Sequence, residues 1–171
     1  MVFTSLIASL VMSQTPAKPT GFTFLSQAYV HRFSKAGLHE FTPKAQTDLK
    51  KFTDMVTVNQ YKDVKDADAL AARANAVLEN YKANQAVVVR TSSVPRTTSK
   101  PAEHLIVVAF GRPTFIEMAF ARFKLEKGVG VSVVYSHRIY GEKVEDKMKK
   151  WLQDNGQKVE NALMAMPIPK V

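Results

Sequence analysis

The chain contains no cysteine among its 171 residues. This absence excludes disulfide bonds, thiolate metal sites, cysteine nucleophiles and thiol-based redox sensing. It does not decide the cellular compartment, since many periplasmic proteins also lack cysteine. Stability must come from a hydrophobic core, which a chain of this length can bury within one domain.

The sequence also lacks the short motifs that mark common catalytic and cofactor sites. Glycine-rich nucleotide loops, the GxSxG nucleophile elbow and the HExxH zinc motif are missing. No metal-ligand spacing connects the four histidines, which are His31, His39, His104 and His137. We therefore expect neither a metal ion nor a cofactor.

Acidic residues are outnumbered: 24 lysines and arginines face 15 aspartates and glutamates, which gives a net charge of +9. The basic residues form no dense stripe with interleaved aromatic side chains, so the composition does not favour nucleic-acid binding. Two similar hexapeptides form a predicted loop at residues 90–101. This loop, or the polar face of the predicted sheet, could instead bind an anion or an acidic envelope partner. The candidate residues are Arg90, Arg96, Arg122, Lys124 and Arg138.

No apolar run is long enough to cross a membrane as a helix. The stretch from Val2 to Met12 has the length of a signal-peptide core, although no basic residue precedes it and SQTPA is a poor cleavage site. Residues 1–17 are therefore predicted to be a signal peptide of a secreted or periplasmic protein, or an apolar segment docked on the domain. Residues 18–171 are predicted to form a single globular α+β domain.

Hydrophobic periodicity predicts three helices in the first half of the chain. Residues 23–36 show helical spacing and are followed by Gly37, while Thr42 and Pro43 suit the start of a helix that continues to Val56. Residues 66–84 form the third helix, with Asp66 or Asp63 as the N-cap. Its predicted buried face consists of Leu70, Ala74, Val77, Leu78 and Tyr81.

The pattern changes to β-branched and alternating residues after Gln85. Residues 85–91, 104–110, 114–126 and 129–140 are predicted as four strands, and their short connections favour an antiparallel meander. Helical spacing returns from Glu142, with a possible break at residues 154–156. The expected fold class is α+β: three N-terminal helices, a four-stranded antiparallel meander, and a C-terminal helix packed on the sheet.

The stretch SVVYSHRIYGE, residues 132–142, groups serine, histidine, arginine and tyrosine side chains. Strand alternation places Ser136 and His137 on opposite faces, which excludes a local serine–histidine dyad. A three-residue connection at 127–129 would match the apolar faces of the last two strands and set Glu117 diagonal to His137. The predicted ligand-binding residues on that face are Glu117, Ala119, Tyr135 and His137.

These features favour a non-catalytic binding domain of the secreted or periplasmic type. It would bind a small apolar ligand or an anionic partner through the antiparallel sheet. One alternative is a small enzyme in which Glu117 and His137 perform acid–base chemistry. Another is a structural subunit of a larger assembly, which would explain an ordered apolar N-terminus.

Overall fold

The computed structural model describes residues 20–171. The chain forms eight strands and two helices in the following order: β1 Phe22–Phe24, β2 Gln27–Lys35, β3 Leu38–Pro43, β4 Asp54–Tyr61, α1 Ala67–Ala83, β5 Val87–Val94, β6 Glu103–Arg112, β7 Phe115–Glu126, β8 Val129–Tyr140 and α2 Val144–Ala165. Within residues 20–171, no helix is long and apolar enough to span a membrane. The predicted signal peptide or docked segment, residues 1–17, lies outside the described residues.

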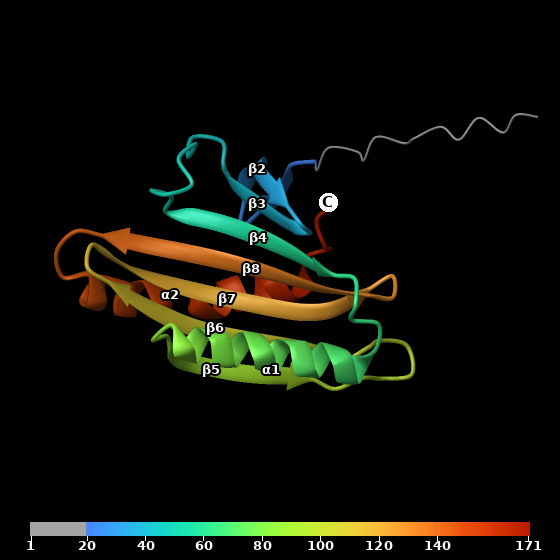
Figure 1. Cartoon of the computed structure of the whole chain (residues 1–171). Helices are drawn as coiled ribbons and strands as arrows, with labels where there is room; N and C mark the ends of the chain where they lie inside the picture. Colours follow the sequence, from blue (N-terminus) through green and yellow to red (C-terminus); the bar gives the residue numbers. More distant parts are fainter. Residues whose placement is uncertain (1–19) are drawn as a thin grey trace, which may run out of the picture.

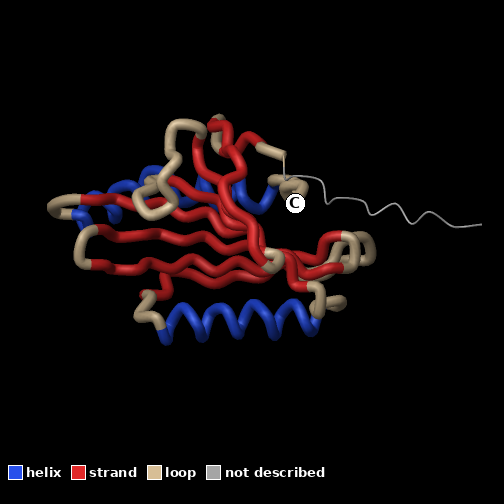
Figure 2. Tube along the Cα trace, turned by 45° about the horizontal axis from the view of Figure 1, so that its top comes forward, coloured by secondary structure: helices blue, strands red, loops and turns tan. Residues whose placement is uncertain are grey.

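All eight strands belong to one antiparallel sheet, in the order β1-β2-β3-β4-β8-β7-β6-β5. Helix α1 carries the chain from β4, near the middle of the sheet, to β5 at one edge. Helix α2 returns after β8 and lies on the opposite face, so the sheet separates the two helices (Figures 1 and 2).

Each face of the sheet has its own hydrophobic core. Phe120, Tyr135 and Leu163 belong to the core beneath α2, which also contains the aromatic side chains of β1 to β3. Leu70 and Phe123 belong to the core beneath α1. The second core lies over β6 and β7, and residues 111–117 around the β6–β7 turn are exposed or half-buried.

The prediction of three N-terminal helices is wrong, because the first two are strands and loops. Leu25 and Ser26 have φ angles of 49° and 64°, and Ala36 and Gly37 have 50° and 84°. Positive φ at both central positions is typical of the type I′ hairpin turn. Gly37 therefore ends a strand, although glycine in the same conformation also ends helices, and that shared preference misled the sequence interpretation.

The predicted second helix is also replaced. Thr42 lies in β3, accepts a hydrogen bond from Arg32 Nε and donates its hydroxyl to the carbonyl of Gln46. A loop follows Pro43, and β4 then begins at Asp54. Phe52 and Val56, which lie within the range of the predicted helix, are buried from this loop and strand instead.

The rest of the prediction matches more closely. Helix α1 is capped by Asp66, whose Oδ1 accepts a hydrogen bond of 2.8 Å from the Ala69 amide, and its predicted face is the one that packs on the sheet. The predicted four-stranded meander is wrong as a description of the sheet: β5 to β8 are consecutive neighbours, but β8 also pairs with β4, and the sheet has eight strands. Helix α2 is continuous through the possible break at residues 154–156, and Gly156 is buried within it.

Candidate functional site

The β7–β8 hairpin determines which side chains meet on each face. Its connection contains two residues, Lys127 and Gly128, with φ angles of 50° and 75°. This type I′ turn sets Glu117 opposite Arg138, and Met118 opposite His137. The predicted three-residue connection and its register are wrong by one residue. A register shift of one residue moves the side chains of one strand to the other face of the sheet. Glu117 and His137 therefore lie on opposite faces and do not meet.

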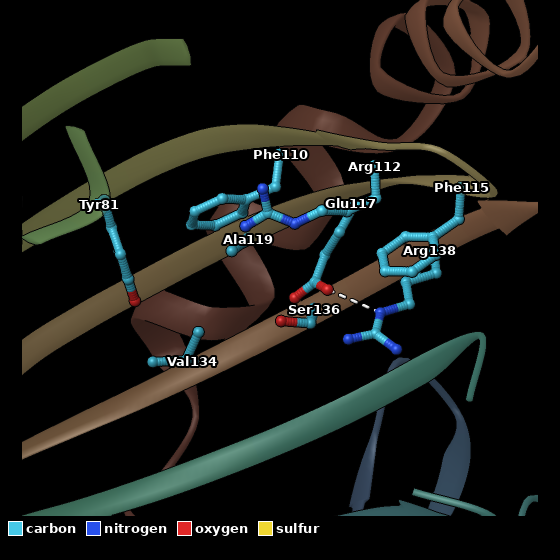
Figure 3. Close-up of a pocket in the computed structure, with 9 residues that line it drawn as sticks. All are labelled: Tyr81, Phe110, Arg112, Phe115, Glu117, Ala119, Val134, Ser136 and Arg138. Atoms are coloured by element: carbon cyan, nitrogen blue, oxygen red, sulfur yellow. Dashed lines mark hydrogen bonds and ion pairs between the residues drawn. The ribbon is translucent and has the colours of Figure 1, made fainter. Parts of the chain in front are cut away.

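A pocket of about 280 Å³ opens where α1, the β6–β7 hairpin and β8 come together; we call it the α1 pocket (Figure 3). Three small or branched side chains from β7 and β8 form its floor, aromatic rings form two walls, and three charged groups complete it. The lining residues are Tyr81, Phe110, Arg112, Phe115, Glu117, Ala119, Val134, Ser136 and Arg138.

Arg138 is held in place on one side of this pocket. Its Nε donates a hydrogen bond of 2.6 Å to Glu117 Oε2, and both side chains are largely buried. Its guanidinium lies 3.8 Å from the ring centroid of Phe52 and 4.4 Å from that of Phe115. Planar guanidinium groups stack well on aromatic faces. Arg138 and Glu117 therefore form a rigid, locally neutral wall.

Arg112 carries the unbalanced charge of the pocket. It is exposed, and its guanidinium lies 5.3 Å from the ring centroid of Phe110. Within residues 20–171, Arg112 forms no ion pair with a carboxylate. The guanidinium can therefore bind a carboxylate or phosphate through two parallel hydrogen bonds.

Two hydroxyl groups also line the α1 pocket. Tyr81 extends from α1 toward β8, which carries Val134 and Ser136, and its ring meets that of Phe110 at 89° (Figure 3). Burial, with smaller contributions from Tyr61 and Glu117, raises the pKa of Tyr81 to about 12, so its hydroxyl keeps its proton near neutral pH. Neither Tyr81 nor Ser136 makes a side-chain hydrogen bond to another described residue, so both hydroxyls are available to a ligand.

The other two predicted ligand-binding residues lie on the opposite face, beneath α2. Tyr135 donates a hydrogen bond of 2.6 Å to Asp54 Oδ1, and His137 Nδ1 lies 2.9 Å from the same oxygen. Trp151 stacks on the His137 ring. The prediction therefore combined residues from two faces: Glu117 and Ala119 line the α1 pocket, while Tyr135 and His137 help to hold α2.

The predicted anion-binding residues do not form one surface. Arg122 is 4% exposed and donates to Glu103 and to two carbonyls at the end of α2. Lys124 pairs with Glu126, and Arg90 pairs with Glu160. Arg96 is exposed in the β5–β6 loop and does not line the α1 pocket. Of this set, Arg138 alone lines the α1 pocket.

Sequence reasoning missed Arg112 and Tyr81. Arg112 is the last residue of β6, but in the sequence it lies between the predicted strands 104–110 and 114–126, and no function was predicted for it. Tyr81 was predicted to lie on the buried face of a helix. Its ring is partly buried against the core beneath α1, but that prediction says nothing of its hydroxyl. A basic residue at a hairpin turn next to aromatic residues is the signal that could have found this end of the site.

Comparisons with known proteins identify a family and a fold. A protein-family model matches residues 17–168, and the chain belongs to that family. A search of curated proteins finds no significant match. The crystal structure of the Saccharomyces cerevisiae Ran-binding protein Mog1p is similar with a TM-score of 0.54 and 10% identity, over 87% of this chain and 93% of that chain. This likeness concerns the fold alone. Human STARD10 aligns with a TM-score of 0.33 and 11% identity, over 79% of this chain and 71% of that chain.

Proposed function

We propose that this family member is a non-catalytic binding domain whose α1 pocket holds a small carboxylate ligand with an apolar body. The observation that carries the proposal is Arg112, a cation without a carboxylate partner within residues 20–171, beside the aromatic walls of a pocket. The aromatic rings of Phe110 and Phe115 would cover the apolar body of the ligand. The guanidinium would bind its carboxylate.

The available hydroxyls support the same ligand class. Tyr81 and Ser136 can each donate to an acceptor on the ligand, and a small number of polar groups among apolar walls is typical of ligand pockets. Glu117 repels an anion only weakly, because Arg138 neutralises it at 2.6 Å. The volume of about 280 Å³ limits the bound part to roughly one ring or a short chain.

Binding without catalysis is favoured by the way these polar groups are paired. The one carboxylate that lines the pocket is engaged by Arg138, and none of the described lining residues forms a nucleophile–base pair. The acid–base alternative required Glu117 and His137 together, and the sheet separates them.

Titration calorimetry with benzoate, and with benzamide as the neutral match of equal shape, tests the proposal. We expect benzoate to bind the wild-type protein, Arg112→Gln to weaken it by about tenfold, or 1.4 kcal/mol, and benzamide to be insensitive to that change. Arg96→Gln is the matched control, since it removes an exposed arginine elsewhere. Equal benzoate affinity in the wild-type protein and the Arg112→Gln variant, or no benzoate binding at all, would overturn the proposal.

We further propose that the protein is secreted or periplasmic, with residues 1–17 removed as a signal peptide. The support is the apolar run from Val2 to Met12. The intact mass of protein purified from its native host decides this. A mass that includes the first 17 residues would contradict secretion by this route.

A further inference from the structure

Two histidines that are eight positions apart in the sequence meet on one hydroxyl at the opposite end of the sheet from α1. His31 Nε2 lies 2.6 Å from Ser34 Oγ, and His39 Nδ1 lies 2.7 Å from the same oxygen. The ring centroids are 6.3 Å apart. Both rings and the hydroxyl are at least partly exposed.

A β-bulge brings these groups onto one face. The register between β2 and β3 shifts between His31 and Phe33, so that His31 pairs with Phe41 and Ser34 pairs with His39. Without the extra residue, positions 31 and 34 would point to opposite faces, because strand side chains alternate. The bulge therefore creates the cluster.

The bulge is held firmly by its extra residue, Arg32. The Arg32 side chain donates from Nε to Thr42 Oγ1 at 2.9 Å, and from Nη2 to the carbonyls of Pro43 at 3.2 Å and Lys44 at 3.0 Å. The His31 ring packs edge to face on buried Phe41, with centroids 5.3 Å apart. The backbone and one of the two rings are thus positioned before any ligand arrives.

The hydroxyl cannot satisfy both rings in the same way. Ser34 has one hydroxyl proton, so it can donate to only one imidazole nitrogen, and the other ring must donate its own N–H to Ser34 Oγ. A cation between the two rings and beside the hydroxyl would accept a lone pair from each ring. Metal–nitrogen bonds of about 2.0–2.1 Å require the two nitrogens to lie within about 4 Å of each other, so both rings would turn toward a common ion.

We propose that His31 Nε2, His39 Nδ1 and Ser34 Oγ form a surface site for a divalent transition-metal ion. Imidazole nitrogens select copper, nickel and zinc, and the general order of stability places Cu²⁺ first. Residues 20–171 contain no group of three or more histidine, cysteine, aspartate or glutamate side chains placed to hold a metal. The site therefore has two imidazoles, and the hydroxyl and water complete the coordination shell.

The test is calorimetric titration of the full chain with Cu²⁺, Ni²⁺ and Zn²⁺ salts alone. We expect one Cu²⁺ ion per chain, with affinity falling in the order Cu²⁺, Ni²⁺, Zn²⁺. His31→Gln and His39→Gln should each weaken Cu²⁺ binding by at least about tenfold, since even the loss of a group that only orients a metal ligand costs that much. Ser34→Ala should weaken it less, because both nitrogens remain.

His104→Gln is the matched control, because His104 also contacts a serine, Ser93, but no second histidine, and it lies near α1. Wild-type Cu²⁺ affinity equal to that of the His31→Gln/His39→Gln double variant would overturn the proposal. If a variant does not fold, NMR of the wild-type protein decides instead. Zn²⁺ must shift the ring signals of His31 and His39 and leave those of His104 unchanged; any other pattern contradicts the site.

Discussion

The imidazole of His137 lies flat against the indole of Trp151, with ring centroids 4.1 Å apart and 8° between the ring planes. His137 belongs to β8 and Trp151 to α2, so the stack joins the helix to the sheet. The indole also meets Phe120 of β7 in an edge-to-face contact, with centroids 6.4 Å apart. Trp151 is therefore an anchor of α2.

Replacing this anchor should loosen α2. We expect Trp151→Ala to lower the free energy of unfolding by about 3 kcal/mol, because it removes a large, partly buried ring. Trp151→Phe keeps an aromatic face and should cost less than about 1.5 kcal/mol. Urea unfolding followed by circular dichroism measures both. Lys150→Ala, at an exposed neighbouring position, should change stability by no more than about 0.5 kcal/mol. Equal losses for Ala and Phe would contradict the stacking role.

Asp54 should make the stability of this region depend on pH. Burial alone would raise the pKa of Asp54, but hydrogen bonds from His137 and Tyr135, the charge of His137 and the Thr53 hydroxyl together hold this pKa below its ordinary value. Because the folded pKa is lower than the unfolded one, the carboxylate stabilises the fold fully above about pH 4 and loses this effect as pH falls through the folded value.

The variant Asp54→Asn, which removes the charge and keeps the size of the side chain, tests this prediction. It should be less stable than the wild-type protein by about 1–3 kcal/mol at pH 6, because the bonds to an ionised acceptor are lost. The difference should shrink when both proteins are unfolded in urea at pH 3. A difference that stays the same at pH 6 and pH 3 would show that the Asp54 charge contributes nothing.

Arg122 should be essential to the end of α2. It donates from Nε to Glu103 Oε2 at 2.7 Å and from Nη1 to the carbonyls of Leu163 at 2.9 Å and Met166 at 2.7 Å. Arg122→Met leaves a carboxylate and two carbonyls without their donor, so we expect a loss of about 3–5 kcal/mol.

Two variants give this prediction its control. Lys124→Ala removes a cation from the same face whose pair with Glu126 is more exposed, and it should cost no more than about 1 kcal/mol. Adding Glu103→Gln to Arg122→Met should recover part of the loss, because the uncompensated carboxylate is then gone. A small effect of Arg122→Met in thermal unfolding would contradict the role of Arg122 in holding α2.

The two-residue β7–β8 turn sets the strand register that forms the α1 pocket, so a change that disfavours its backbone conformation should lower stability. Gly128→Ala places a side chain at a φ of 75° and should destabilise the protein by about 1–2 kcal/mol, although no atom lies near the added methyl group. Gly111→Ala is the control: it also adds a methyl group in open space, but its φ is not in the left-handed region. It should be neutral or stabilising by up to about 1 kcal/mol. Equal effects of the two changes on thermal unfolding would rule out the type I′ turn.

The parts of the fold that sequence could predict are those with strong local signals. Helix α1 has high-propensity alanines, an aspartate cap and one apolar stripe, and these signals agree with one another. The strands of the meander have β-branched runs between turn residues. By contrast, Leu25 and Ser26 adopt positive φ without any glycine to mark the turn, so a hairpin was mistaken for a helix.

The candidate site was only partly predictable, because its contacts depend on the length of a turn that the sequence does not decide. Glu117, Ala119 and Arg138 were all singled out, yet the partner of Glu117 depended on whether the turn held two residues or three. Both lengths suit a turn that contains glycine, and only one places Arg138 opposite Glu117. Arg112 and Tyr81 come from segments far from β8 in the sequence, and no local pattern connects them.

The sequence by itself determined the absence of thiol chemistry, the positive net charge, the capped alanine-rich helix and the order of the last four strands, because composition and short-range periodicity decide these properties. The tertiary structure alone decided that β4 pairs with β8, that Glu117 meets Arg138 while His137 meets Asp54 and Trp151, and that a bulge joins His31 to His39. These relationships depend on strand register and on long-range pairing. A shift of one residue changes every contact on a sheet face while leaving the local sequence pattern unchanged.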